Sequence, residues 1–575
     1  MTSRCDNMKL KPSIIGLIAL GIPLTVAEAS ATVSVARAAD MSASASAGAY
    51  ATEFATEAPS TALLLQQTKV GSKAPAKTTV SPAASKGAAV GKAPARGTAA
   101  TTRRAVTPAP LRFTTPRGAE ALTADLNSIL PSRTRNGQWG AMVVSISRGD
   151  TLLSVNAGNE MLPASTMKLF TSAIALEKLG PEHSFSTDVL RDGSIDDNGV
   201  LHGDLILRGD GDPALSPRFV PGGPSAPMNT LAQFTKTMGI TRVTGDIIAD
   251  ASAFEPGGIP EGWLSRYAGA GYAAPFSALS LNDNIIIAGV VPGAIGAIAK
   301  PFLEPETRAI NVSSTVRTVA GSAVKISARL VADDRIVVSG TIGAKAAPAR
   351  YQVVVNDPAR FTAGAYLSAL EEQGIKVDGA LRAGLTPASA VILTSMPSPP
   401  LARIVSVMNR ESINLFAEML FRGAARAEDK SVVGSAVTAA STLGEFLQMQ
   451  VGVPSGAVSV TDGSGLSVLD RVTPRSLVKL LDHAHRASWG STFHASLPVA
   501  GESDLLKTRM RETPAQGNLH AKTGTTNDVV GLSGYVTAEN GEILAFAFLY
   551  NGTDRSYARE TIDAMGPTLA AFSRD

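Results

Sequence analysis

The sequence Pro163-Ala164-Ser165-Thr166-Met167-Lys168-Leu169-Phe170 marks the point where a short polar segment opens into an apolar run that extends to Leu179. If Ser165 lies in the first turn of a helix, the side chains of Ser165 and Lys168 leave the same face and can touch. A serine hydroxyl becomes an effective nucleophile when a nearby base accepts its proton, and a lysine is such a base only when burial or another cation keeps it neutral. Ser165 is therefore a candidate nucleophile and Lys168 its candidate base.

The same Ser-x-x-Lys spacing occurs at two other places, so spacing alone does not select Ser165. Ser322 and Lys325 lie at the start of an alternating run that predicts a strand, where residues three apart face opposite ways. Ser476 and Lys479 lie in a predicted helix whose apolar stripe falls on leucines, and we expect both side chains on a solvated polar face. Context therefore favours Ser165.

The length and composition indicate a large protein, and the arrangement of its histidines does not indicate a metal site. The chain has 575 residues, of which 44% are hydrophobic and 18% charged, enough for several domains and an ample core. A formal net charge of +3 does not indicate a nucleic-acid binder. The six histidines lack a His-Glu-x-x-His arrangement, and His483 and His485, two apart on a predicted helix, cannot share one ion. We therefore expect no metal and no cofactor.

The first 38 residues read as a signal peptide. A basic start is followed by an apolar run over 13–27 and by Ala-x-Ala sites that end at Ala29 and Ala38. The apolar run is shorter than the roughly 20 residues that span a bilayer. We therefore expect export to the periplasm or cell envelope. The single cysteine, Cys5, falls within this signal, so the exported protein is expected to contain no disulfide.

Residues 39–110 are predicted to form a disordered tether rich in Ala, Pro and Lys. Their few large apolar side chains cannot offset the entropy lost on ordering. Every charged residue over 69–104 is basic, namely Lys69, Lys73, Lys77, Lys86, Lys92, Arg96, Arg103 and Arg104. Two interpretations of this charge remain open, a solubilised linker and a peripheral contact with anionic envelope polymers.

From residue 111 onwards the patterns predict a folded α+β protein. We expect a helix over 117–130, a hairpin of strands over 140–146 and 151–155, and then the helix that begins at Ser165. Short strands and Gly- and Pro-rich loops follow to about residue 357. Within them the turn around Asp210 and Asp212 favours a structural role over a cation site, and the polar segment 271–284 is expected to line a groove.

The last third of the chain predicts helices and then the clearest sheet. Helices are expected over 361–373, 401–408 and 412–425, with Ser412 and Asn414 at the polar start of the last one, where a plain helix cap is the competing interpretation for Ser412. Three successive antiparallel strands are expected over 520–526, 529–537 and 542–550, followed by a helix over 555–572. The resulting boundaries are a catalytic domain formed by 111–185 and 357–575 and a mostly-β insertion over 186–356.

Three short motifs follow one another in this frame. Ser165-Thr166-Met167-Lys168, Ser412-Ile413-Asn414 and Lys522-Thr523-Gly524 form the ordered triplet of penicillin-interacting serine enzymes. With the long segment between the first two motifs and the segments 274–284 and 462–467, the chain resembles the D-alanyl-D-alanine carboxypeptidases/endopeptidases of the penicillin-binding protein 4 type, peptidase family S13. The resemblance implies a penicillin-binding/β-lactamase-like transpeptidase domain, an antiparallel sheet of about five strands flanked by helices and interrupted by the insertion.

The resemblance also implies an activity and roles for individual residues. The expected enzyme is a serine D-Ala-D-Ala carboxypeptidase/DD-endopeptidase that acts on peptidoglycan stem peptides through an acyl-enzyme and is inhibited covalently by β-lactam antibiotics. Ser165 would attack the carbonyl, Lys168 would take its proton with Lys522 and burial keeping it neutral, and the N–H groups of Ser165 and Thr525 would form the oxyanion hole. Ser412 would relay the proton and Asn414 would orient Lys168. The terminal carboxylate would be received by the segment Lys522, Thr523, Gly524 and Thr525.

Two other functions remain as alternatives. A β-lactamase would share the motifs but would release the acyl group rapidly, although no counterpart of the deacylating glutamate of the class A enzymes is present. A non-catalytic cell-wall-binding protein would keep the fold as a scaffold, against which the intact Ser165, Lys168, Ser412 and Lys522 argue. Relatives often carry an arginine after the position of Ser467, whereas this chain has Val468, so the preferred stem-peptide side chain stays open.

Overall fold

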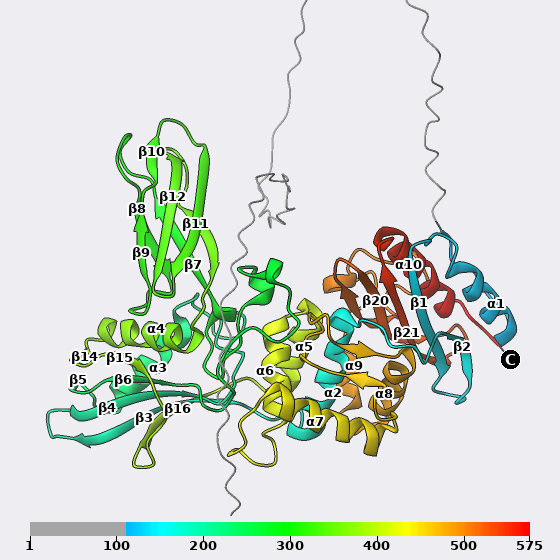
Figure 1. Ribbon diagram of the computed structural model, residues 1–575, viewed down its shortest axis with the longest axis horizontal. Coiled ribbons are helices and arrows are strands. Elements are labelled where there is room, and N and C mark those ends of the chain that lie inside the picture. The colour runs from blue at the N-terminus through cyan, green and yellow to red at the C-terminus, as the bar shows by residue number, and fades with distance from the viewer. Residues whose placement is uncertain (1–110, 575) are drawn as a thin grey trace, which may run out of the picture. The chain divides into compact units, whose positions relative to one another are not determined.

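The computed structural model describes residues 111–574, so the predicted signal peptide and tether lie outside the described residues (Figure 1). Its central element is a five-stranded sheet in the order β19-β20-β21-β1-β2, in which every neighbouring pair is antiparallel. The predicted α+β class and five-stranded sheet are therefore confirmed. The strands are β1 (Gly137–Ser145), β2 (Thr151–Val155), β19 (His520–Thr525), β20 (Val529–Thr537) and β21 (Ile543–Gly552).

The sheet is buried on both faces, as the alternation along β21 shows. Ala547 and Leu549 belong to the core on one face, while Phe546 and Phe548 belong to the core on the other, because successive side chains of a strand point to opposite sides. The second face is covered by α1 (Ala119–Ile129) and α10 (Arg555–Ala570), which pack on each other and on the sheet. Both faces of the sheet are thus buried along its central strand β21.

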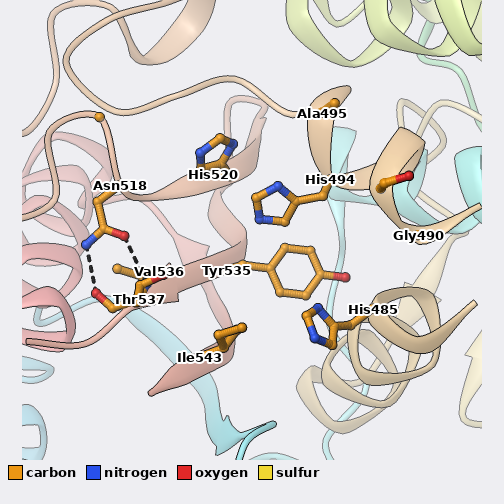
Figure 2. A pocket seen from close by; sticks show the side chains of 12 residues that line it. His485, Gly490, His494, Ala495, Asn518, His520, Tyr535, Val536, Thr537 and Ile543 are labelled. Carbon is orange, nitrogen blue, oxygen red and sulfur yellow. Dashed lines mark hydrogen bonds between the residues drawn. The ribbon is translucent and has the colours of Figure 1, made fainter. Parts of the chain in front are cut away.

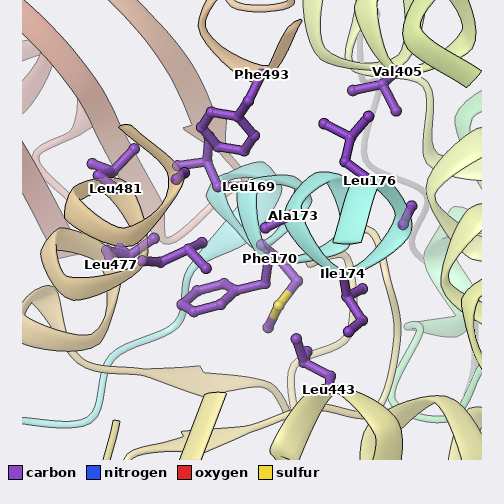
Figure 3. Packing of buried hydrophobic residues seen from close by; sticks show 14 of the residues in the cluster. Leu169, Phe170, Ala173, Ile174, Leu176, Val405, Leu443, Leu477, Leu481 and Phe493 are labelled. Atoms are coloured by element: carbon purple, nitrogen blue, oxygen red, sulfur yellow. The ribbon is translucent and has the colours of Figure 1, made fainter. Parts of the chain in front are cut away.

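The first face is covered by a group of helices around α2 (Lys168–Leu179). Every residue from Lys168 to Leu176 is buried. Figure 3 shows side chains of α2 among residues of the surrounding helices. A helix that is covered on all sides must lie inside the core, so the segment that carries Ser165 is held rigidly. The neighbours are α5 (Leu401–Glu411), α6 (Asn414–Ala424), α7 (Ala436–Phe446), α8 (Pro474–Arg486) and α9 (Gly490–Ala495).

A second body of sheets is inserted between α2 and α5. Its largest sheet has seven strands, namely β3 (Ser186–Ile195), β4 (Val200–Gly209), β5 (Arg242–Val243), β6 (Ile247–Asp250), β14 (Lys376–Val377), β15 (Leu381–Ala383) and β16 (Val391–Pro397). Two smaller sheets contain β7 (Ile285–Val291), β8 (Lys300–Glu304) and β13 (Ala349–Val354), and β9 (Asn311–Ser314), β10 (Arg317–Val319), β11 (Val324–Ala332) and β12 (Arg335–Gly343).

The inserted body includes residues from both sides of the expected boundary at 356. Helices α3 (Ala226–Thr237) and α4 (Pro358–Glu372) pack together in one core with the inserted strands, and β16 pairs with β3. A boundary at 356 separates elements that share this core. We therefore infer that the inserted part extends to about Pro397, where the chain returns to α5.

Two expectations for the inserted part are settled by burial and ion pairing. The segment 271–284 was expected to line a groove, and its first part does so, because Tyr272, at 54% exposure, lines a hollow of about 310 Å³, whereas residues 273–281 are buried. Asp210 pairs with Lys430 over 2.9 Å, and the Asp212 carboxylate accepts a hydrogen bond from the N–H of Ala214, so this turn is structural. None of the helices within 111–574 has both the length and the apolarity needed to cross a membrane.

Candidate active site

Ser165 lies in a short 3-10 turn, Ala164–Met167, that runs directly into α2. Ala164 has a φ of 45°, a left-handed value that is rare for a residue with a side chain. The loop at Gly465 packs tightly against this turn. A Cβ at Gly465 would lie 1.8 Å from the carbonyl oxygen of Ala164, so only glycine fits, and the turn is held from this side.

The Nζ of Lys168 is fully buried and surrounded by three oxygens. It lies 3.1 Å from Ser165 Oγ, 2.6 Å from Asn414 Oδ1 and 2.8 Å from the carbonyl oxygen of Ser464. The orientation of the Asn414 amide follows from its other atom, because Nδ2 donates to the carbonyl oxygen of Tyr272 over 2.8 Å.

These contacts suit a neutral amine. Asn414 Oδ1 and the Ser464 carbonyl can only accept hydrogen bonds. A neutral Lys168 has two N–H groups for these two acceptors, and its lone pair is then left for the third neighbour, Ser165 Oγ. The geometry therefore allows Lys168 to receive the proton of Ser165.

Burial favours the neutral form of both active-site lysines. Burial lowers the pKa of Lys168 to about 8, against the opposing effect of three nearby carboxylates, of Asp462, Glu418 and Asp470. Burial, and then the charge of Lys168, lower the pKa of Lys522 well below its ordinary value. Sequence reasoning expected Lys168 to be kept neutral by burial and Lys522. It missed these carboxylates, which favour the charged form of Lys168.

Ser412 is positioned by an unusual backbone conformation between two helices. It ends α5 in the left-handed region, at φ 60° and ψ 41°, while the N-terminal cap position of α6 belongs to Ile413. The interpretation of Ser412 as the cap at the start of the helix over 412–425 is therefore wrong, since Ser412 is the C-terminal cap of α5. Its Oγ instead accepts a hydrogen bond from Lys522 Nζ over 2.9 Å.

Strand β19 brings the third motif against the nucleophile turn. Lys522 Nζ also donates to the carbonyl oxygen of Thr523 over 3.0 Å. A Cβ at Gly524 would lie 2.7 Å from the carbonyl oxygen of Pro163, so the glycine permits the close approach of β19 to the residues before Ser165. Thr525, the next residue of the strand, is exposed.

The three motifs meet at a hollow of about 310 Å³. All the predicted site residues lie at this hollow or directly beneath it, with Lys168 and Lys522 completely buried. The residues that line it are Ser165, Tyr267, Tyr272, Ser412, Asn414, Gly465, Leu466, Thr525, Thr526, Asn527 and Arg555.

Asp462 organises the loop beneath the base, a role that sequence reasoning missed. Its carboxylate accepts hydrogen bonds from the backbone N–H groups of Ser464, Gly465 and Ser467, over 2.9, 2.5 and 2.8 Å. It also accepts one over 2.5 Å from the indole of Trp263, in the inserted part. The loop in turn presents the Ser464 carbonyl to Lys168. The sequence 462–467 was noticed, but only as a point of resemblance.

The two competing Ser-x-x-Lys pairs lie away from the hollow. Ser476 is buried, with an exposed fraction of 1%, and its N–H donates to Thr473 Oγ1 over 3.0 Å while its Oγ accepts from the Thr473 N–H over 3.1 Å. The expectation of a solvated polar face is thus wrong for Ser476, which stabilises the start of α8 in a capping box. Ser322 is exposed just before β11.

A larger hollow, of about 700 Å³, contains none of the motif residues. Figure 2 shows the ring of Tyr535 between the imidazoles of His494 and His485, with His520 nearby. Burial, followed by the charges of His520 and His485, lowers the pKa of His494 to about 4. No group of three or more His, Cys, Asp or Glu side chains within 111–574 is arranged to hold a metal ion. The smaller hollow is therefore the candidate active site.

Known proteins are similar to this chain in both sequence and fold. The model of the D-Ala-D-Ala carboxypeptidase 3 (S13) family matches residues 122–572. A D-alanyl-D-alanine carboxypeptidase of Actinomadura sp. (strain R39) is 34% identical over 476 residues, which are 79% of this chain and 85% of the relative. The D-alanyl-D-alanine carboxypeptidase DacB of Haemophilus influenzae is 27% identical over 449 residues, 76% of this chain and 90% of the relative.

The solved structure of penicillin binding protein 4 (dacB) from Haemophilus influenzae has a TM-score of 0.65 to this chain at 25% identity. The match covers 77% of this chain and 97% of that one. The similarity therefore includes nearly the whole of the solved protein.

Proposed function

The chain belongs to the D-Ala-D-Ala carboxypeptidase 3 (S13) family and is a D-Ala-D-Ala carboxypeptidase, and we propose that it cleaves peptidoglycan stem peptides through an acyl-enzyme formed on Ser165. The observation that carries this proposal is the placement of Lys168. Its buried Nζ has two acceptor-only neighbours and one hydroxyl neighbour, Ser165 Oγ at 3.1 Å. That arrangement is what a lysine needs to act as the base of a serine nucleophile.

Acylation begins when Ser165 Oγ attacks the carbonyl carbon of the penultimate D-Ala. Its proton passes to Lys168 Nζ as the bond forms. The carbonyl oxygen gains negative charge, which the N–H groups of Ser165 and Thr525 stabilise, a contribution of about 3 kcal/mol for each donor. Preorganised donors act best when the backbone is rigid, and the burial of α2 and the packing of β19 support this rigidity.

The leaving D-Ala then needs a proton on its amine. Ser412 relays to it the proton that Lys168 took from Ser165, because its hydroxyl is hydrogen-bonded to Lys522 and faces the same hollow as Ser165. Lys168 is then neutral again. The terminal carboxylate of the substrate lies against Lys522, Thr523 and Thr525, where it favours the charged form of Lys522. Water then attacks the ester on Ser165, with Lys168 as the base, and frees the shortened peptide.

Covalent inhibition by β-lactams follows from the same chemistry. A β-lactam offers Ser165 a strained amide, and the leaving nitrogen stays attached to the acyl group instead of departing. The penicillin binding protein 4 of Haemophilus influenzae has also been solved in complex with a novel β-lactam. We expect Ser165 to form a long-lived adduct with penicillin.

A labelled-penicillin gel tests the proposal. Wild-type protein should carry covalent label, Ser165→Ala should carry none, and Ser322→Ala should label like wild type because Ser322 is exposed and lies outside the hollow. Label that appears and is lost within seconds would indicate a β-lactamase. Absence of label on folded wild-type protein would indicate the non-catalytic wall-binding alternative.

The balance between carboxypeptidase and endopeptidase activity is tested by the products. Purified cell wall is digested, and the released peptides are identified by mass spectrometry. Loss of a single D-Ala from stem peptides marks carboxypeptidase activity, whereas separation of cross-linked dimers into monomers marks endopeptidase activity. We expect both, and both should be absent from Ser165→Ala.

We also propose that the protein is exported and that its basic segment over 69–104 contacts the cell envelope. We expect the mature protein in the periplasm or cell envelope, where its substrate lies, and a weak attraction between the basic segment and anionic envelope polymers. Deletion of 39–110 should preserve turnover of a small D-Ala-D-Ala peptide but weaken retention on cell-wall sacculi at low salt. Since exposed charges are screened by salt, high salt should abolish the difference in retention between the full-length and the shortened protein. A difference in retention that does not change with salt would contradict the electrostatic attraction.

A further inference from the structure

Both acceptors that orient the Lys168 amine are held in place by the inserted part of the chain. Asn414 Oδ1 lies 2.6 Å and the carbonyl oxygen of Ser464 lies 2.8 Å from Lys168 Nζ. Neither acceptor belongs to α2, the helix that carries Lys168, so each needs a support of its own. One segment of the inserted part, residues 255–276, supplies contacts to both.

The amide of Asn414 is fixed by a backbone oxygen of this segment. Its Nδ2 donates to the carbonyl oxygen of Tyr272 over 2.8 Å. Only one orientation of the amide satisfies both neighbours, because the reverse orientation would turn its NH2 group toward the amine and its oxygen toward the Tyr272 carbonyl. The Tyr272 carbonyl therefore determines which atom of Asn414 faces Lys168.

The carbonyl of Ser464 is supported through Asp462, whose carboxylate is held by Trp263. The indole Nε1 donates to Asp462 Oδ2 over 2.5 Å, and both side chains are buried. The same carboxylate accepts from the N–H groups of Ser464 and Gly465, over 2.9 and 2.5 Å. A hydrogen bond to a charged acceptor is strong where water is excluded, so Trp263 fixes the loop that presents the Ser464 oxygen.

The backbone beside Trp263 fits closely against the same loop. The N–H of Val468 donates to the carbonyl oxygen of Gly262 over 3.1 Å. Gly262 has a φ of 79°, and a Cβ there would lie 2.2 Å from Ser467 Oγ, closer than two such atoms can approach without a shift. Trp263 also belongs to an apolar cluster against which Leu466, a lining residue of the hollow, packs. A shift of segment 255–276 therefore shifts the loop as well.

The helix that carries Asn414 is tied to the same segment two turns further on. Asn414, Glu418 and Arg422 follow one another at intervals of four residues, so they share one face of α6. The buried Arg422 guanidinium pairs with Glu418 and with Glu255, each over 2.9 Å, and its carbon lies 3.6 Å from the centre of the Phe276 ring. Glu255 and Phe276 belong to segment 255–276, so these contacts restrict movement of α6.

We propose that segment 255–276 positions the base Lys168, and that Trp263 is the positioning residue through which it holds the Ser464 carbonyl. The inference rests on the proposed function, since it assigns the segment a part in the acylation of Ser165. Trp263 is not among the residues that line the hollow. Its loss should therefore slow the proton transfer, which requires a well-aligned amine, and should leave ligand binding largely unchanged.

The test compares two buried tryptophans that each donate an indole N–H to a carboxylate. Trp263→Phe removes the donor to Asp462 and keeps an aromatic ring. Trp489→Phe is the matched control, because Trp489 donates to Glu177 over 2.8 Å and neither residue lines the hollow. With a fluorescent penicillin, Trp263→Phe should lower the maximal acylation rate roughly 10- to 100-fold. The concentration that gives half of this rate should stay within about twofold of wild type, and Trp489→Phe should keep the wild-type values.

Two further variants separate the loss of the hydrogen bond from a general loss of structure. Trp263→His keeps a ring with an N–H donor, and it should recover part of the acylation rate that Trp263→Phe loses. Combining Trp263→Phe with Asp462→Asn should slow acylation little beyond Asp462→Asn alone, because both changes act through one contact.

A pair of glycines gives a test that does not depend on the folding of Trp263→Phe. Gly262 and Gly269 both lie in the segment, at φ 79° and 77°, so alanine strains the backbone alike at both positions. A Cβ at Gly269 meets nothing within 4 Å, whereas one at Gly262 meets Ser467. Gly262→Ala should therefore slow acylation, and Gly269→Ala should not.

Wild-type acylation rates in folded Trp263→Phe and Gly262→Ala proteins would overturn the inference. Equal slowing in the matched controls, or a change confined to the half-saturating concentration, would overturn it as well. Penicillin labelling of the wild type reports on the proposed function separately. A labelled wild type whose variants acylate at the wild-type rate refutes only the role of segment 255–276, whereas an unlabelled, folded wild type refutes the proposed function.

Discussion

Lys522 donates a hydrogen bond from Nζ to the Oγ of Ser412 over 2.9 Å. Lys168 Nζ lies 3.1 Å from Ser165 Oγ. Each of the two serines in the hollow is therefore within hydrogen-bond distance of a different lysine. The two lysines are coupled, since the charge of Lys168 lowers the pKa of Lys522. One pair can take up the proton of the nucleophile, and the other can pass this proton on to the leaving group.

Replacing Lys522 by alanine should move the rise of acylation with pH to higher pH. In the complex, the ligand carboxylate favours the charged form of Lys522, and this charge disfavours a proton on Lys168. Without it, the pKa of Lys168 rises and the base becomes neutral only at higher pH. The measurement is the pH dependence of acylation by a fluorescent penicillin, and a rise that stays in place or moves down would leave burial as the cause of the lowered pKa.

Replacing Asp462 by asparagine should move the same rise in the opposite direction. The Asp462 carboxylate raises the pKa of Lys168 against the effect of burial, so its loss lets the amine deprotonate at lower pH. The maximal rate should also fall, by up to about 100-fold, because the loop that presents the Ser464 carbonyl loses its anchor. Asp482→Asn, which removes an acid paired with Arg486 on α8, is the control and should leave the profile unchanged.

Ser476→Ala should lower stability without affecting the chemistry. Ser476 completes the capping box of α8 with Thr473, and loss of such a cap costs about 1 kcal/mol. Ser322→Ala, on an exposed serine, should leave stability within about 0.5 kcal/mol of wild type. Urea denaturation measures both, and penicillin labelling should persist in both. Loss of labelling in a folded Ser476→Ala protein would contradict the assignment of Ser165.

Arg574→Met should destabilise the protein in a way that depends on pH. Arg574 contacts Asp150 over 2.6 and 2.7 Å and Glu542 over 2.5 Å, and breaking charged hydrogen bonds of this kind costs about 2 kcal/mol. The hydrogen bond from Arg574 lowers the pKa of Asp150 below 3.8. Burial would raise the pKa of Glu542, but its hydrogen bonds outweigh this effect and lower it below 4.5.

For two carboxyl groups whose pKa is lower in the folded state, the stabilisation is present above their unfolded values and is lost as pH falls through the folded values. The difference in unfolding free energy between wild type and Arg574→Met should therefore be full at pH 7 and shrink below about pH 4. Arg511→Met, at an exposed arginine whose Nε donates to the carbonyl oxygen of Lys507, is the control. A difference that stays constant down to pH 3 would contradict the ion-pair explanation.

The features that the sequence predicted are those that depend on neighbouring residues. The strands predicted over 529–537 and 542–550 pair as β20 and β21, and the helical spacing of Ser165 and Lys168 predicted their contact, because both patterns follow from local backbone geometry. The resemblance that the three motifs carry implied the five-stranded sheet of the domain.

The features that were missed depend on distance in space. Glu418, Asp462 and Asp470 come from a helix and a loop whose sequences do not mark them as neighbours of Lys168. The left-handed conformation of Ser412 has no signal in the residue type, since serine rarely adopts it. The end of the insertion at about Pro397 had no local signal, because β16 pairs with β3 across 200 or more positions, as Val391 opposite Arg191 shows.

The pairing of β1 with β21 has a consequence for the order in which the protein can fold during synthesis. Asn136 and Tyr550 are hydrogen-bonded although 414 positions separate them, and β1 has its place between β2 and β21. Closing so long a loop carries a large entropic cost, and contacts of this kind form slowly. Ser165 and Lys168 are therefore synthesised early, but the active site forms only after β21 has been synthesised. We expect every truncated chain that ends before β21 to be inactive.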